Sequence, residues 1–208
     1  MKTWIKHLMS TLALACIALS PLAAESYDSD CCENSGDGCC SCETIFSLAL
    51  FDPIQTTSEC DFINGVRINL IYGSNCSVVG LDLGLVNRLS NNMTGYQVGL
   101  VNIVGNDLVG TQIGALNQVC GNGLGFQHGI VNMVQGHFSG IQDAFLLNSA
   151  CSVCGVQSGA INYTEELTGF QFGIINYTNR LSGIQLGLIN IQTSRPNFSV
   201  LPILNVSW

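Results

Sequence analysis

The stretch that decides the fold is Gly169-Phe-Gln-Phe-Gly-Ile-Ile-Asn176, because nearly the same residues return as Gly183-Ile-Gln-Leu-Gly-Leu-Ile-Asn190. The pattern of Gly, apolar, Gln, apolar, Gly, two apolar residues and Asn recurs with small changes in eight copies from Gly80 onward, of which the copy at Gly140 carries one extra residue, and a degenerate copy begins at Gly65. The leading glycines are 15 residues apart five times and then 14 residues apart twice. Self-similarity at a fixed short period is typical of solenoids and arrays.

Each copy has the pattern of a β-strand followed by a turn. Over its first five positions, apolar residues alternate with Gly and Gln, which is the two-residue period of a strand. Polar groups such as Ser90–Asn92 and Gly105–Asp107 follow the Asn, and these residue types favour turns because they tolerate positive φ or bond their own backbone. No amphipathic helical period occurs after Ala24, so we predict an all-β protein.

The repeat predicts a parallel β-solenoid of about eight coils, each formed by one copy of 14–15 residues. Such coils stack about 4.8 Å apart, so equivalent amide side chains lie above one another and form stabilising ladders. We expect apolar residues such as Tyr96, Val98 and Phe170 to fill the interior, and Gly and Gln to face outward. The expected ladders are Gln97, Gln112, Gln127, Gln142, Gln157, Gln171 and Gln185, and Asn87, Asn102, Asn117, Asn132, Asn148, Asn162, Asn176 and Asn190.

An antiparallel β-barrel of the outer membrane is the alternative fold. One tilted strand of about ten residues per copy is long enough to cross a membrane, and the segment Val200–Trp208 is strand-like and ends on an aromatic residue. In a solenoid the same segment is a strand that caps the last coil. We favour the solenoid because antiparallel neighbours give no in-register ladder. In addition, the connectors are equally short, whereas such barrels alternate short turns with long loops.

The N-terminus has the layout of a secretory signal peptide. Lys2, Lys6 and His7 precede an apolar stretch, and Ala23-Ala24 offers a cleavage site before Glu25. Lipidation at Cys16 is the alternative, although the apolar stretch continues past it. The chain carries a formal charge of −8, and cleavage removes both lysines, leaving 4 arginines against 14 acids, or −10. This charge excludes nucleic-acid binding, which needs a basic surface.

The cysteine content agrees with export. Without Cys16 ten cysteines remain, and in an oxidising compartment they are expected to form disulfides within or between chains. A metal site in the N-terminal cluster and redox activity of Cys151–Cys154 are the alternatives. The cluster lacks a known zinc spacing, and the C-x-x-C lacks its usual βαβ setting. The disulfide candidates are Cys31, Cys32, Cys39, Cys40, Cys42, Cys60, Cys76, Cys120, Cys151 and Cys154.

The run G-x-Q-x-G-x-x-N, as in Gly169–Asn176, resembles a family of bacterial surface-repeat proteins with tandem GxQxGLxN copies. The resemblance covers residues 45–208 and implies an exported surface protein. It implies no activity, cofactor or site residue. The expected segments are a signal peptide at 1–24, an acidic Cys-rich segment at 25–45, opening strands and the degenerate copy at 46–79, the repeat domain at 80–195 and a capping strand at 196–208.

One position of the repeat departs from its usual residue type in three consecutive copies. The fourth position of most copies is apolar, but in three consecutive copies it is His128, Asp143 and Ser158. Coils stacked in register place Asp143 between the other two, whereas a hydrolytic triad needs His between the acid and Ser, so we predict no catalysis. The three residues then form either a ligand-contact patch or a structural polar group, partly exposed or mutually bonded.

The sequence favours a non-enzymatic protein of the cell envelope, outer membrane or cell surface with a structural or adhesive role. Titratable residues are scarce in the repeats, and no catalytic or phosphate-binding motif occurs, so we expect no enzyme activity, metal or cofactor. Expected partners are envelope or outer-membrane components and disulfide-linked copies. The alternatives are an outer-membrane barrel or small pore, and a solenoid that binds a glycan or a surface through its Gln face.

Overall fold

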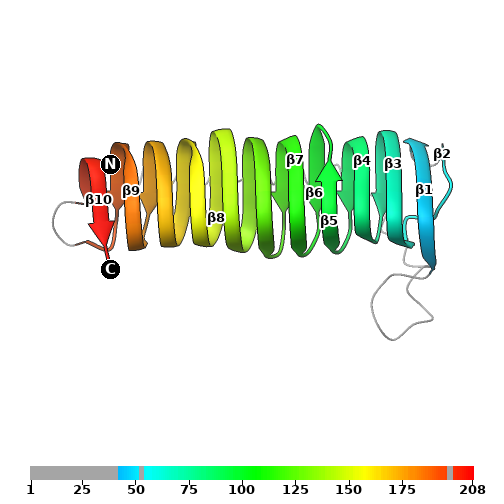
Figure 1. Ribbon diagram of the computed structural model, residues 1–208, viewed down its shortest axis with the longest axis horizontal. Helices are drawn as coiled ribbons and strands as arrows, with labels where there is room; N and C mark the ends of the chain where they lie inside the picture. Colours follow the sequence, from blue (N-terminus) through cyan, green and yellow to red (C-terminus); the bar gives the residue numbers. More distant parts are fainter. Residues whose placement is uncertain (1–41, 52–53, 196–198) are drawn as a thin grey trace. The chain divides into compact units, whose positions relative to one another are not determined.

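The computed structural model describes residues 42–51, 54–195 and 199–208. All of them belong to the second of two units into which the chain divides, Cys40–Trp208. This unit consists of β-coils stacked in one row (Figure 1). The predicted signal peptide, the alternative at Cys16 and the cysteines up to Cys40 lie outside the described residues.

The described elements are all β-strands, and most coils contain a long, bent strand. In the continuous run of β8, several coils follow one another without a break (Figure 1). The bounds are β1 Glu43–Phe51, β2 Ile54–Gln55, β3 Phe62–Asn75, β4 Ser77–Leu89, β5 Met93–Val98, β6 Val101–Val104, β7 Leu108–Val119, β8 Gly123–Thr178, β9 Arg180–Gln192 and β10 Val200–Ser207.

Neighbouring coils pair in parallel and in the register of the repeat. Gly95 pairs with Gly110, and Gln97 pairs with Gln112. The parallel β-solenoid is therefore confirmed, and the antiparallel barrel is wrong. The degenerate copy in β3 and the preceding strand β1 join the same stack in parallel.

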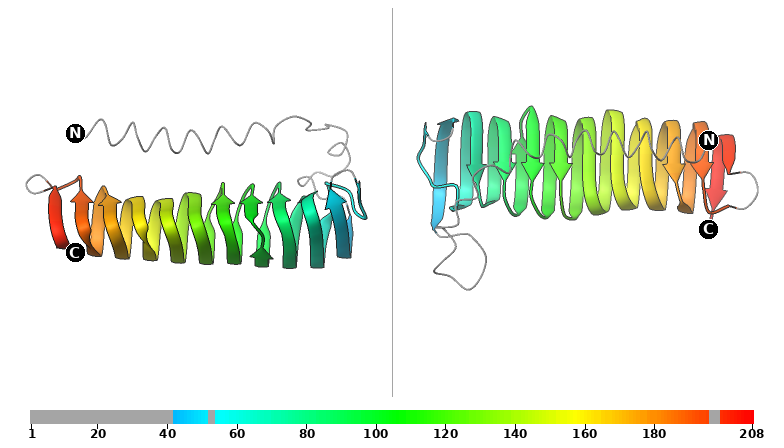
Figure 2. Two further views of the ribbon diagram at one scale, coloured as in Figure 1. Left: turned by 90° about the horizontal axis from the view of Figure 1, so that it is seen from above. Right: turned by 180° about the vertical axis from the view of Figure 1, so that it is seen from behind.

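The two ends of the stack depart from this rule. Strand β10 pairs antiparallel with β9 at one end, and β2 pairs antiparallel with β1 at the other (Figure 2). Each terminal coil is thus followed by a short reversed strand rather than by another coil. The segment predicted to cap the last coil occupies this position as β10.

The orientation expected for the side chains is wrong. The ladder glutamines are fully buried, whereas Tyr96, Val98 and Phe170 are 62%, 37% and 40% exposed. The amides therefore fill the interior, and the apolar residues of the alternating segment face outward. The reason is that the in-register amides satisfy one another, so their burial leaves few polar groups without a partner.

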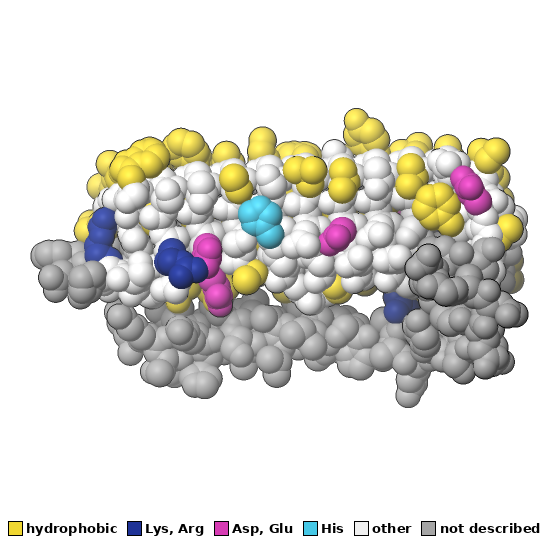
Figure 3. All heavy atoms as spheres, turned by 90° about the horizontal axis from the view of Figure 1, so that it is seen from below, with side chains coloured by type: hydrophobic (Ala, Val, Ile, Leu, Met, Phe, Trp, Pro, Cys, Tyr) yellow, Lys and Arg dark blue, Asp and Glu magenta, His cyan; other side chains and the backbone are white. Residues whose placement is uncertain are grey.

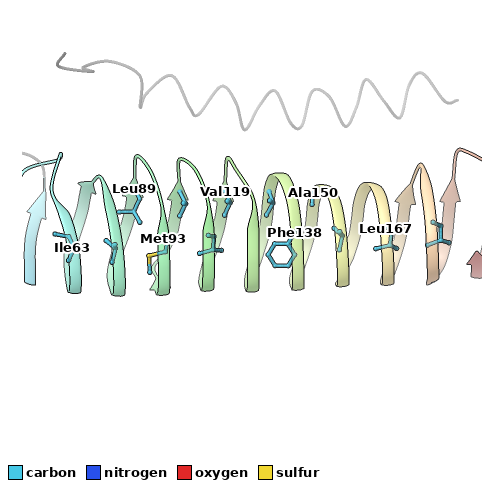
Figure 4. Close-up of a cluster of buried hydrophobic side chains, with 13 residues drawn as sticks. Ile63, Leu89, Met93, Val119, Phe138, Ala150 and Leu167 are labelled. Carbon is cyan, nitrogen blue, oxygen red and sulfur yellow. The ribbon is translucent and has the colours of Figure 1, made fainter. Parts of the chain in front are cut away.

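A narrow apolar core runs beside the buried amides. It consists of buried residues from successive coils, such as Leu89, Met93 and Val119 (Figure 4). Phe138 occupies space that Gly123 leaves open in the preceding coil, since a Cβ on that glycine would approach the Phe138 ring within 2.6 Å. The core residues thus compensate one another in size between adjacent coils.

The leading glycine of each copy is required by the backbone. Gly125 has φ +129°, and an added Cβ would collide with the carbonyl oxygen of Gly110 in the preceding coil. Residues with a side chain rarely adopt this conformation. The glycine column therefore permits the close stacking that aligns the amides.

Candidate functional site

Two hydrogen-bonded amide ladders run through the interior. Along the Gln ladder, each Nε2 donates to the Oε1 of the preceding coil at 2.7–2.8 Å. Along the Asn ladder, each Nδ2 donates to the Oδ1 of the following coil at 2.8–3.0 Å. Both predicted ladders are confirmed, and their donors point in opposite directions.

A buried ion pair closes the N-terminal end of the Gln ladder. Arg67 and Asp82 stand at the Gln position of their copies, and both side chains are fully buried. The guanidinium donates to both carboxylate oxygens at 2.7 Å, and Gln97 donates to Asp82 at 2.8 Å. This pair was not predicted, although the two charged residues at a Gln position were a signal for it.

The other end of the Gln ladder is closed by a neutral residue. Asn205 of β10 donates through Nδ2 to Oε1 of Gln185 at 2.7 Å and is almost fully buried. The hydrogen-bonded chain therefore continues without a gap from Asn205 to Arg67.

The degenerate copy enters the Asn ladder by an exchange of two residues. Gly73 pairs with Asn87, and Asn69 pairs with Gly84. The Asn69 side chain fills the space above Gly73 and donates to Oδ1 of Asn87 at 2.9 Å. The degenerate copy thus still contributes one hydrogen-bonded amide to the Asn ladder, even though Gly and Asn have changed places.

These contacts make the interior a structural element rather than a binding surface. Every ladder amide from Gln97 to Gln185 is fully buried and bonded to its neighbours. A ligand cannot reach these side chains, so a site on a Gln face is excluded.

The outer surface carries an extended apolar face. We use this name for the outward residues at the second, fourth and sixth positions of the copies, and Figure 3 shows hydrophobic side chains following one another along the stack. Among the described residues, 29 large hydrophobic side chains are exposed, against 13 in the buried core cluster. Members of the face include Leu85, Tyr96, Leu100, Ile113, Ile130, Phe145, Phe172, Ile174, Leu186 and Leu188.

The predicted polar column interrupts this face. Nδ1 of His128 lies 2.9 Å from Oδ2 of Asp143, and the side chains are 53% and 42% exposed. The ring of His128 also stacks on Phe126, with centroids 6.2 Å apart. Ser158 is half-buried in the next coil, and no side-chain bond joins it to Asp143. The column is therefore an exposed His–Asp pair with a neighbouring serine.

A shallow hollow of about 640 Å³ adjoins the pair. Its floor is the column of fifth-position residues Gly99, Gly114, Gly129 and Ala144, which lies between the fourth-position and sixth-position rows. Phe145, in the copy that carries one extra residue, is 83% exposed and lines the hollow. Phe145 was not predicted as a site residue, although the insertion marked its copy as unusual.

The cysteines of the described residues form no metal-binding cluster. No group of three His, Cys, Asp or Glu side chains that could hold a metal occurs within this part of the chain. Cys42, Cys120, Cys151 and Cys154 have free thiols, Cys60 is half-buried, and Cys76 is 2% exposed. Disulfide formation stays a prediction.

One tyrosine near the turns is electrostatically perturbed. Tyr163 stacks on Tyr177 with ring centroids 4.9 Å apart. Burial raises the pKa of Tyr163, and the neighbouring Tyr177, Glu165 and Cys151 raise it further. The phenol therefore stays protonated at neutral pH and serves as packing rather than as a base.

Comparison of the chain with models of known families, with curated proteins and with solved structures finds no match. The resemblance to bacterial surface-repeat proteins therefore stays a prediction. In the part of the chain that the structure describes, no helix is sufficiently long and apolar to span a membrane.

Proposed function

We propose that this chain is a non-enzymatic, exported protein of the cell envelope or cell surface, in which the solenoid is a rigid scaffold with an adhesive apolar face. The exposed apolar face supports this proposal, because large contiguous apolar surfaces in proteins usually mark interaction sites. The interior needs none of these residues, since the ladders and the narrow core already fill it.

Lipid is the surface that this face fits best. The face is periodic, and its residues are mainly aliphatic and aromatic, with one charged interruption at His128 and Asp143. A lipid layer accommodates such a surface without matching its shape in detail. A protein partner would need complementary pockets and polar contacts around them.

Vesicle flotation of the mature protein tests this proposal. The probe is a vesicle of phosphatidylethanolamine and phosphatidylglycerol. We expect the protein to float with the vesicles, and a variant with Leu100→Asn, Ile130→Asn and Leu188→Asn to stay in the aqueous fraction. The control carries Gln135→Asn and Glu165→Gln, which change exposed residues outside the apolar face.

Two results would contradict the proposal. Equal flotation of the triple variant and the control would show that the apolar face does not contact the vesicles. If the protein does not float and sediments as a stable dimer, the apolar face binds a second copy of the chain instead of lipid.

A further inference from the structure

Three departures from the repeat coincide at one place. The fourth position becomes polar at His128 and Asp143, the fifth position changes from Gly to Ala144, and the copy that begins at Gly140 gains one residue, so that Phe145 follows Ala144. All of these residues line the same hollow. Changes that were unrelated would be expected to fall on different faces of the stack.

The insertion leaves the interior intact. Asn132 still donates to Oδ1 of Asn148 at 3.0 Å, although 16 residues separate the two instead of 15. The extra residue is therefore accommodated without a break in the Asn ladder, and Phe145 of the same copy is 83% exposed. The Phe145 ring forms a raised aromatic wall next to the His–Asp pair.

The hollow has an apolar end and a polar end. It extends over four coils, or about 14 Å at the usual spacing between strands. Val98 and Ile113 line the coils at one end, and His128 and Asp143 occupy the same row at the other. Ile130 and the small Ala115 form the opposite wall. The shape suits a chain-like apolar group that ends in a polar head.

The polar end favours a cation. Oδ2 of Asp143 is engaged by His128, whereas Oδ1 accepts no hydrogen bond from the described residues. The carboxylate is partly exposed, and the exposed ring of Phe145 lines the same hollow. A carboxylate and an aromatic face both attract an ammonium group. The chain's formal charge of −8 adds to the preference for a cation over an anion.

We propose that this hollow binds an amphiphile that has an alkyl chain and a cationic amine head. The alkyl chain lies over the glycine floor between Val98, Ile113 and Ile130. The ammonium donates to Asp143 and contacts the ring of Phe145. This site goes beyond the adhesive function and does not depend on it, because a soluble ligand can fill the hollow in the absence of a membrane.

Three eight-carbon ligands that differ only in the head test the proposal. Octylamine, octanoate and octyl glucoside are titrated into the mature chain by calorimetry at neutral pH, below their micelle concentrations. We expect octylamine to bind at least about tenfold more tightly than octanoate, because the Asp143 charge attracts one head and repels the other. Equal affinities for these two ligands, or tightest binding of octyl glucoside, would overturn the proposal.

Matched variants locate the two ends of the ligand. Asp143→Asn should weaken octylamine about threefold to tenfold and leave octyl glucoside unchanged. Glu165→Gln removes one negative charge from an exposed position of β8 outside the hollow and should leave octylamine binding unchanged. Ile113→Asn should weaken all three ligands alike. If Asp143→Asn and Glu165→Gln behave identically, the cationic head does not sit at Asp143 and the proposal fails.

A second experiment tests whether the ligand is a free amphiphile or the headgroup of a lipid in a bilayer. Phosphatidylglycerol vesicles are compared with and without phosphatidylethanolamine, using wild-type protein and Asp143→Asn. Additional capture by the amine lipid that Asp143→Asn removes would identify the bilayer as a source, in support of the proposal. Binding of soluble octylamine alone, again dependent on Asp143, would support it for a free amphiphile. Loss of the Asp143 dependence in both assays would overturn it.

Discussion

Replacing Gln127 with Met in the middle of the Gln ladder isolates the contribution of the buried amide bonds. Gln127 donates to Oε1 of Gln112 and accepts from Nε2 of Gln142, each at 2.8 Å. Met has a similar length and no branch, so it fills the same space with little strain. The substitution therefore removes two hydrogen bonds and leaves two buried polar groups without their partner.

The expected loss of stability follows from those two groups. An unsatisfied buried donor or acceptor costs about 1–3 kcal/mol, so Gln127→Met should lower the free energy of unfolding by about 2–6 kcal/mol. That is a large part of the total stability of a domain, which is about 5–15 kcal/mol. Ile130→Met is the control, because Ile130 lies in the same coil and is exposed. Its effect should stay within about 0.5 kcal/mol.

Urea unfolding of the mature chain, followed by circular dichroism, measures the difference. Because repeat proteins unfold with limited cooperativity, amide hydrogen exchange should accompany it. Exchange should accelerate most in the coils that contain Gln112 and Gln142. If Gln127→Met unfolds at the same urea concentration as Ile130→Met, the glutamines are not bonded in the interior, and the outward orientation expected from the sequence would be restored.

Four further outcomes are expected. Arg67→Gln should cost about 3–5 kcal/mol in urea unfolding, because it leaves the Asp82 carboxylate buried without a cation; adding Asp82→Gln should recover most of the loss by extending the ladder. Gly125→Ala should lower the unfolding midpoint steeply, since backbone strain alone costs about 1–3 kcal/mol and the collision with the preceding coil adds to it. Asp143→Leu should change the free energy of unfolding by less than about 0.5 kcal/mol, because the carboxylate is 42% exposed. N-terminal sequencing of the mature protein should begin near Glu25, and an intact Met1 in cell extracts would contradict export.

The coil length, parallel register and both ladders were predictable because each depends on sequence spacing alone. A 15-residue step repeated in one direction places Gln97 above Gln112 whichever way the side chains point. The orientation was not predictable from alternation, because a strand with period two has two faces and the pattern does not say which is inside. Placing the more hydrophobic face inside then predicted the wrong orientation.

A signal for the correct orientation was present in the repeats. The Gln and Asn positions scarcely vary in type, whereas the position before Gln is Tyr96, Thr111 and Phe126 in consecutive copies. A packed interior tolerates little change in volume, and a solvent-facing row tolerates much more. The variable row is the exposed one.

The candidate site was predictable only in part. His128 and Asp143 were expected to be adjacent because they share a position in consecutive coils, and the structure joins them at 2.9 Å. The hollow could not be predicted, because it depends on whether Phe145 faces outward in the copy that carries the extra residue. The preserved bond from Asn132 to Asn148 shows that the extra residue leaves the Asn ladder unbroken.

The direction of the Gln ladder is determined by Asp82. An amide can point either way along a ladder, but a carboxylate only accepts hydrogen bonds. Gln97 must therefore donate to Asp82, and every later glutamine then donates toward the N-terminus. The reverse direction would place the Gln97 oxygen against the carboxylate.

The Asn ladder takes its direction from the backbone instead. Each Nδ2 has a second bond to a main-chain carbonyl, as Asn87 has to Val98 at 3.0 Å and Asn102 has to Ile113 at 2.9 Å. These carbonyls accept only, so they hold each amide nitrogen toward the following coil. Flipping one asparagine would break the bond to each neighbouring asparagine, as in the Gln ladder, and would in addition place an oxygen against the main-chain carbonyl. Both ladders are therefore collective, but the Gln ladder takes its direction from one buried charge at its end, whereas the Asn ladder has main-chain carbonyls along its length that favour the same direction.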